Sequence, residues 1–309
     1  MSEQEQPDHD QRFKGLIVEF FREFLYCFFP DWAARFDLDS VDWLTQEIFP
    51  DPPQGVRRAL DLVCRLRLKP GVAPPFEGGA EGGLVLVHVE IESNDRIAGF
   101  RRRCFEYYSD LRRKYDLPVW PIGLFLRVGL DGVGWTTYEE TFWGRPVLEF
   151  SFAYVGLPAL NTEDYLNGEN LLGVALTALM RVPRERRAEL RGEALDRIVS
   201  SGQNDIRRRL LAECVAEYSG LDDEEWERLE RQFVTRKTQE ALSTMPTMMD
   251  FIKRDDRREL VFPVLEGKFG PLSESVKKRI MAMWKDELQQ LLFDVTLNGK
   301  TLKELGLED

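Results

Sequence analysis

The sequence predicts an α/β domain followed by an all-α region, and three observations carry this prediction. Apolar runs typical of buried strands recur up to residue 155, and one long amphipathic stretch, residues 97–115, separates two of them. After Pro158 the strand pattern stops, and only helical periodicity with polar N-capping residues remains. We therefore predict two parts, residues 1–158 and residues 159–309.

The elements of the first part follow in a simple order. An aromatic, amphipathic helix is expected at residues 13–29, ended by Pro30. Strands are expected at residues 41–49, 59–68, 83–93, 119–128 and 147–155, with a helix at residues 97–115. The Pro- and Gly-rich loop KPGVAPPFEGGAEGG joins the second and third strands, so these two should form an antiparallel hairpin.

The second part should be a set of helices, many of which begin at a capping Asp, Ser, Thr or Asn. They are expected at residues 165–180, 185–200, 204–219, 222–243 and 273–293. Helices with such alternating acidic and basic stretches could dock against the core, form a homodimer or hold a partner.

Composition limits the classes of function. The net charge of -12 over 309 residues argues against a protein that coats nucleic acid nonspecifically, although residues 95–114 are locally basic. The two histidines and the four scattered cysteines, none in a C-x-x-C pair, argue against zinc sites and a disulfide framework, and indicate a reducing cytoplasm. No signal peptide is visible, and the most apolar early stretch contains Glu19, Arg22 and Glu23, so no membrane partner is expected.

The third strand, LVLVHVEIES, carries two glutamates on one face. Because side chains alternate along a strand, His88, Glu90 and Glu92 should share a face with the apolar Leu86. In a symmetric hairpin register Asp61 would lie opposite Glu90, with Cβ atoms about 4.5–5.5 Å apart. A slip of one residue would instead send Asp61 to the other face.

Three converging carboxylates repel one another unless a cation lies among them. An oxygen-only cluster suits Mg²⁺ or Mn²⁺ better than zinc. The register therefore predicts a divalent-cation site at Asp61, Glu90 and Glu92.

These residues resemble the PD-(D/E)XK nuclease superfamily, and within it the chain looks most like the recombination-promoting, transposase-related (Rpn-like) nucleases. The resemblance covers roughly the first half of the chain. It begins at His9-Asp10 and Phe13-Lys14, continues through Ala59-Leu60-Asp61-Leu62-Val63 and Val89-Glu90-Ile91-Glu92-Ser93, and ends with Arg103 and Tyr107 on the following helix.

The resemblance implies a restriction-endonuclease-like αβββαβ core and a metal-dependent DNA endonuclease. Asp61 and Glu90 would bind Mg²⁺ or Mn²⁺, and Asp61, Glu90 and Glu92 would form the catalytic set. The third position is usually Lys in the superfamily and commonly Gln in this family, so Glu92 is a departure from the pattern. It could bind a second cation or position the attacking water, but it cannot supply the positive charge of a Lys.

Several further residues are candidates for support. Glu19 or Glu23 on the first helix is a candidate fourth acid, and Glu19 is the preferred one of the two. Arg103 and Tyr107, spaced i, i+4, would either contact phosphate or orient the carboxylates. Arg101, Arg102 and Arg103 are candidate nucleic-acid contacts, and the plainer reading of such a run is a solvated helix face.

Two other functions fit parts of the same pattern. A catalytically inactive nuclease-like fold that serves as a protein-interaction module would explain the acidic net charge and the glutamate at position 92. Two carboxylates about 5 Å apart would also suit a retaining glycosidase, but no tryptophan-lined sugar groove is apparent near them.

Overall fold

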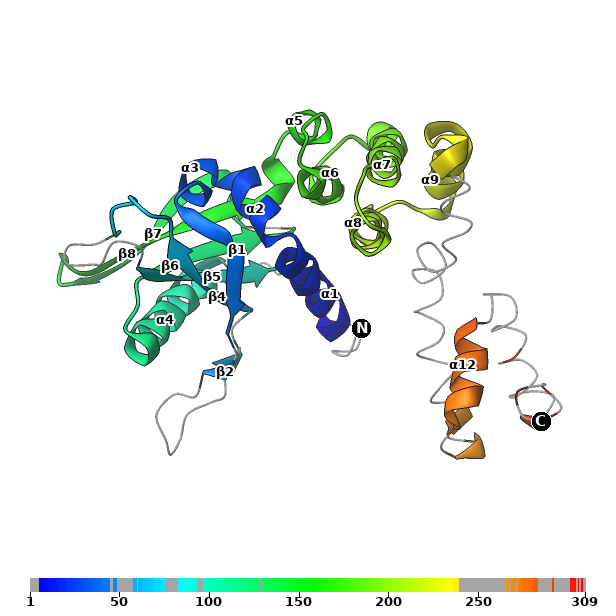
Figure 1. Ribbon diagram of the computed structural model, residues 1–309, viewed down its shortest axis with the longest axis horizontal. Coiled ribbons are helices and arrows are strands. Elements are labelled where there is room, and N and C mark those ends of the chain that lie inside the picture. Colours follow the sequence, from blue (N-terminus) through cyan, green and yellow to red (C-terminus); the bar gives the residue numbers. More distant parts are fainter. Residues whose placement is uncertain are drawn as a thin grey trace. The chain divides into compact units, whose positions relative to one another are not determined.

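The computed structural model describes residues 6–44, 47–48, 58–59, 61–75, 83–93, 97–127 and 129–238, together with parts of 265–307 (Figure 1). The chain forms two compact units that divide between Phe233 and Val234. The boundary predicted after residue 158 therefore falls inside the first unit. The division into a nuclease-like part and a helical part stays a prediction about function.

An open six-stranded mixed sheet forms the centre of the first unit. Its strands are β1 (Phe36–Trp43), β4 (Leu62–Leu68), β5 (Leu84–Glu92), β6 (Val119–Phe125), β7 (Gly132–Phe142) and β8 (Arg145–Gly156), in the spatial order β1-β4-β5-β6-β8-β7. A separate two-stranded ribbon pairs β2 (Glu47–Ile48) with β3 (Arg58–Ala59). The predicted α/β class is confirmed at this level.

Strand directions follow from the connections. β1, β4 and β5 pair antiparallel, whereas α4 (Ile97–Tyr115) crosses from β5 to β6, and β6 runs parallel to β5. A parallel pair needs such a crossover, and its helix covers a face of the sheet. β8 is parallel to β6 and pairs antiparallel with β7 in a hairpin.

Helices lie on both faces of the sheet. In Figure 1, α4 lies on one side, and α2 (Phe21–Phe28) and α3 (Pro30–Ala33) lie on the other. Leu86 packs with Tyr107 and Leu111 of α4, while the alternate residues of β5 face away from that helix. Because both faces are covered, residues 85–92 are all buried, and all of them except His88, Glu90 and Glu92 are apolar.

The first predicted helix is two helices. α1 spans Gln6–Glu19, and α2 begins after Phe20, whose φ of -112° and ψ of 29° depart from helical values. The amide of Phe20 still donates to the carbonyl of Leu16, and Phe24 donates to Phe20, so the break is a kink. The side chains of Phe20 and Phe24 remain in the core, which explains why the helical periodicity continues across it.

Two strands differ from the sequence prediction. β1 begins at Phe36 and ends at Trp43, earlier than the predicted 41–49, because Phe36 and Leu38 alternate inward between aspartates that masked the strand pattern. β7 was not predicted at all. It is the edge strand and is mostly exposed, so its sequence GVGWTTYEETF lacks the apolar alternation of a half-buried strand.

Every regular element described after β8 is helical. These elements are η1 (Leu157–Ala159), α5 (Thr162–Leu166), α6 (Leu171–Leu176), η2 (Thr177–Leu179), α7 (Arg184–Val199), α8 (Asp205–Tyr218), α9 (Asp223–Arg228), the π-helical turn η3 (Leu229–Phe233) and α12 (Glu274–Ala282). The predicted helix 165–180 is broken, since Asn170 caps the N-terminus of α6 by accepting a hydrogen bond from Gly173.

The helices of the first unit pack on its N-terminal segment. Asn170 donates a hydrogen bond of 2.7 Å to the carbonyl oxygen of Glu23 in α2. Arg207 of α8 bonds to the carboxylate of Glu23, and its guanidinium lies 4.1 Å from the ring centroid of Phe20. The helices from α5 to η3 therefore stabilise the sheet unit from which the sequence prediction had separated them.

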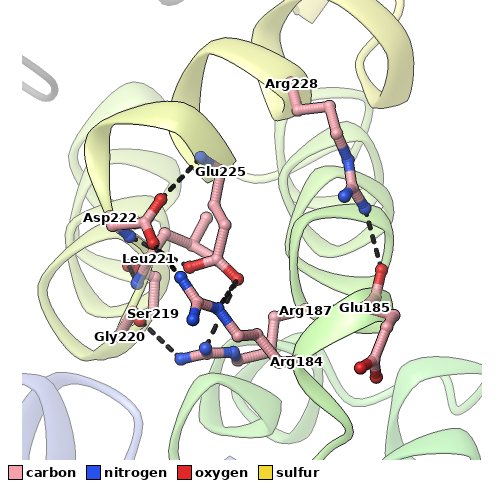
Figure 2. Close-up of polar contacts among 9 residues, drawn as sticks. All are labelled: Arg184, Glu185, Arg187, Ser219, Gly220, Leu221, Asp222, Glu225 and Arg228. Atoms are coloured by element: carbon pink, nitrogen blue, oxygen red, sulfur yellow. Dashed lines mark hydrogen bonds and ion pairs between the residues drawn. The ribbon is translucent and has the colours of Figure 1, made fainter.

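A network of ion pairs connects α7 to the start of α9 (Figure 2). Asp222 and Glu225 form a capping box, in which each side chain accepts a hydrogen bond from the backbone of the other residue. Arg184 contacts Asp222 at 2.5 Å, and Arg187 lies 3.3 Å from Glu225 and donates to the carbonyl of Gly220. Arg184 and the backbone bond from Glu225 hold the pKa of Asp222 below its usual value.

The second unit has a small core of its own. It contains Leu265, Leu272, Val276, Ile280, Leu291, Leu302 and Leu307. Parts of the predicted helices 222–243 and 273–293 lie outside the described residues, and homodimer formation through the C-terminal helices stays a prediction. Within the described residues, no helix is both long and apolar enough to cross a lipid bilayer.

Candidate functional site

The hairpin register brings Asp61 to the end of β5. Leu62 pairs with Val89 and Val63 with His88, so Asp61, one residue before β4, stands opposite Glu90. This is the symmetric register predicted from the sequence. Asp61 Oδ2 accepts a hydrogen bond of 2.7 Å from the backbone N–H of Ile91, which fixes the carboxylate beside the strand.

Arg103 of α4 binds both glutamates of β5. Its Nε lies 2.8 Å from Glu90 Oε1, and its Nη2 lies 2.8 Å from Glu92 Oε2. The two glutamates are 4% and 7% exposed, so the fork of one guanidinium binds two carboxylates that water hardly reaches. Burial would lower the pKa of Arg103, but the two carboxylates outweigh burial and raise it.

Lys14 of α1 supplies the second cation of the cluster. Its Nζ lies 2.8 Å from Asp61 Oδ1, and the lysine is buried. Lys14 belongs to the stretch that carries the resemblance, but no pattern in the sequence assigned it a role. Its position in the second half of α1, five residues before Glu19, gave no signal that it reaches the start of β4.

His88 and Tyr107 form the apolar floor below Glu90. The His88 ring is fully buried, with its Nε2 3.3 Å from Glu90 Oε2, and it meets the ring of Tyr107 edge-on. The angles at that contact do not make a hydrogen bond, so Glu90 Oε2 has no hydrogen-bond partner in the described part of the chain. Tyr107 thus lies near the acidic cluster, as the helical spacing from Arg103 predicted.

The pKa of Asp61 is raised to about 6. Burial is the larger cause and the neighbouring Glu90 the next, and together they outweigh the lowering effects of Lys14 and the Ile91 amide. Asp61 therefore titrates near neutral pH in spite of its ion pair. A carboxyl with these neighbours is a candidate functional group.

We expect this pKa to make the stability of the fold depend on pH. Asp61 is raised from 3.8 to about 6, so the folded state holds the proton longer than the unfolded state. The tighter proton binding in the folded state stabilises the fold by on the order of 2–3 kcal/mol. This stabilisation is complete below about pH 4 and is lost as the pH rises through about 6. Denaturant unfolding of the wild type and of Asp61→Asn between pH 4 and pH 7 should show the wild type losing stability relative to the variant. A relative gain over this range would contradict the assignment.

The remaining sequence candidates lie elsewhere. Arg102 is exposed and pairs with Glu106 one turn later, whereas Arg101 is half-buried and its Nε has no hydrogen-bond partner in the described part of the chain. Glu19 lies 3.6 Å from Arg207 of α8, an ion pair that does not involve the acidic cluster. A polar hollow of about 290 Å³ opens beside Arg103, lined by Gly99, Arg102, Arg103, Glu106 and Tyr107.

The carboxylates of the cluster are suitable ligands for a divalent cation, but in this structure they are bound to Arg103 and Lys14 instead. Carboxylate oxygens are the ligands that Mg²⁺ and Mn²⁺ prefer, and Glu90 Oε2 is buried with no hydrogen bond. Among the described residues, however, no three acidic, histidine or cysteine side chains are arranged to hold a metal ion. Arg103 and Lys14 provide the positive charge in this arrangement, so a cation would have to compete with them.

Comparison with family models, curated proteins and solved structures finds no match to this chain. The case for a function therefore depends on the geometry of the cluster.

Proposed function

We propose that this protein is a metal-dependent DNA endonuclease of the PD-(D/E)XK type. The observation that carries the proposal is the register that sets Asp61 opposite Glu90, with Glu92 two residues further along the same face of β5. The order of elements also supports it, because α1–α2, β1, β4, β5, α4 and β6 follow one another as helix, three strands, helix and strand. The ribbon β2–β3 is then an excursion between the first two strands.

The residues of the cluster have distinct roles in this proposal. Asp61 and Glu90 would hold Mg²⁺ or Mn²⁺, which when bound supplies Lewis-acid activation of the phosphate and of water. Arg103 holds Glu90 and Glu92 in place, and a third of its side chain is exposed beside the polar hollow, where a phosphate can reach it. Lys14 orients Asp61 from α1.

A cleavage assay tests the proposal. Purified wild type with Mg²⁺ or Mn²⁺ should cut supercoiled or single-stranded DNA, while Asp61→Asn and Glu90→Gln should each lose about 100-fold or more. Lewis-acid stabilisation is worth several kcal/mol, and each 1.36 kcal/mol corresponds to a factor of ten. Glu139→Gln, an exposed change on β7, is the matched control and should retain full activity.

Glu92→Gln adds a second arm to this assay. A glutamine at this position keeps an oxygen for Arg103 and matches the residue common in the resembling family, so the variant should remain active. The nuclease proposal is wrong if the wild type cuts no form of DNA with either metal and its melting temperature does not change when metal is added.

A protein-interaction module on the same fold is the second candidate. It is favoured by the ion pairs of the cluster, in which each of the three carboxylates contacts Lys14 or Arg103 in the place where a cation would lie. In that case the carboxylates would have a structural role alone, and removing them would change stability without any effect on DNA.

A further inference from the structure

A large aromatic cavity lies at the end of the sheet away from Glu90 and Glu92. Its volume is about 830 Å³, and its lining includes Leu68 at the end of β4, Val85 near the start of β5 and Trp120 near the start of β6. A strand rises about 3.3 Å per residue, so the five residues from Val85 to Glu90 separate the two places by roughly 17 Å. The cavity is therefore distinct from the acidic cluster.

The cavity exists because β6 and β8 separate. Their pairing begins only at Ile122 with Ala153, one residue after Pro121. Proline has no N–H with which to continue the ladder. The residues of β8 before that point, Leu148–Ser151, pair with β7 alone and form one wall of the opening.

Stacked aromatic rings also line the cavity. Trp120 stacks on Trp32 with centroids 4.8 Å apart and planes 25° apart, and on Phe36 at 5.9 Å and 20°. Trp135 of β7 extends this series, 5.3 Å from Trp32, and it is 49% exposed. A flat ring entering the cavity would meet aromatic faces that are already held in place by one another.

The charge of the lining is positive. Arg35 and Arg112 line the cavity against one carboxylate, Glu149, and neither arginine pairs with an acidic side chain among the described residues. The guanidinium of Arg35 lies 5.6 Å from the ring of Trp32. Trp120 is buried, and its indole N–H has no acceptor in the described part of the chain, so a polar ligand atom that reached the floor would remove that cost.

We propose that this cavity binds a nucleotide, with the base against Trp135 and Trp32 and the phosphate near Arg35 and Arg112. Every base has a flat face that stacks on aromatic rings, and arginine forks match phosphate oxygens. The volume lies in the range of about 300–1,000 Å³ typical of small-ligand sites. Aromatic cages often bind cationic ligands, but the two arginines would repel a cation here. The same chemistry is offered by a free mononucleotide and by a segment of single-stranded nucleic acid, and the site does not depend on the nuclease proposal.

Binding assays without metal test this inference. Calorimetric titration in EDTA should show adenosine 5′-monophosphate, or a hexamer of deoxyadenylate, binding to the full chain. Trp135→Ala should weaken binding about fivefold or more, as expected for the loss of one stacking surface. Trp143→Ala is the matched control, because Trp143 is 92% exposed at the tip of the β7–β8 hairpin and outside the cavity. The double change Arg35→Gln, Arg112→Gln should weaken the monophosphate more than it weakens adenosine.

The possible results distinguish a free nucleotide from a nucleic-acid strand as the ligand, and they also distinguish failure of this inference from failure of the nuclease proposal. If the hexamer binds more than tenfold tighter than the monophosphate, the site binds single-stranded nucleic acid. If the two affinities are equal, the site binds free nucleotides. The inference is overturned if neither ligand binds the wild type at millimolar concentration, or if Trp135→Ala and Trp143→Ala behave alike. Asp61→Asn should bind as the wild type does, so failure of this site and failure of the nuclease proposal are distinguishable.

Discussion

Arg103→Met should destabilise the protein by about 3 kcal/mol or more at pH 7. The change removes the guanidinium that binds the buried carboxylates of both Glu90 and Glu92. Breaking a buried ion pair by removing one partner costs about 3–5 kcal/mol, and the partial exposure of Arg103 places the effect toward the lower end. Denaturant unfolding at pH 7 measures the loss.

Added Mn²⁺ separates the two proposed functions in this variant. If the cluster binds a divalent cation, Mn²⁺ should restore stability to Arg103→Met, by about 2.7 kcal/mol at one hundred times its dissociation constant. The wild type should gain less, because Arg103 competes for the same oxygens. Arg102→Met is the control and should leave the unfolding midpoint unchanged, since Arg102 is exposed beside the cluster. A variant that stays equally unstable with and without Mn²⁺ would favour the interaction module.

Arg191→Met should be the most damaging change among the later helices, with a loss of about 2–4 kcal/mol. Arg191 is 1% exposed, and it donates to the carbonyls of Thr177, Ala178 and Met180 at the C-terminal end of η2. These carbonyls carry the negative end of a helix dipole, which stabilises the charge even though burial lowers the pKa of Arg191 to about 10.

Thermal and denaturant unfolding check this second expectation. Methionine fills a similar volume, so the measured loss reports the unpaired carbonyls more than a cavity. Arg209→Met, which removes an arginine paired with Glu213 within α8, is the control and should behave as an ordinary surface change. A loss for Arg191→Met no larger than for Arg209→Met would show that the carbonyls find other partners.

The sequence predicted the parts of the site that depend on local periodicity. Alternation placed Glu90 and Glu92 on one face, and the hairpin loop set the register that puts Asp61 opposite Glu90. Helical spacing placed Tyr107 one turn after Arg103 on the same side of α4, and both lie near the cluster. Each of these inferences depends on the regular side-chain spacing of a strand or a helix, which tertiary packing did not change.

The features of the site that the sequence did not predict depend on contacts between segments that are far apart in the chain. Lys14 reaches Asp61 from another element, and no period relates a basic residue of α1 to the start of β4. Glu19, a candidate for the cluster, pairs instead with Arg207, because α8 packs against α1. The cavity beside Trp120 likewise depends on where two strands separate, although Pro121 was a signal that the ladder would stop there.

The contacts of Glu23 have a consequence for the order in which the chain can fold during synthesis. Its carbonyl is bound by a side chain 147 residues later, and its carboxylate by one 184 residues later. A ribosome releases the N-terminus first, so α1 and α2 emerge long before their covering helices exist. We expect Phe21 of α2 to be covered early by Trp43, whereas Phe28 stays uncovered until Tyr165 and α6 have been made, and α1 until α8 has been made. Closing such long loops is also slow, so completion of this unit should be a late, largely post-translational event.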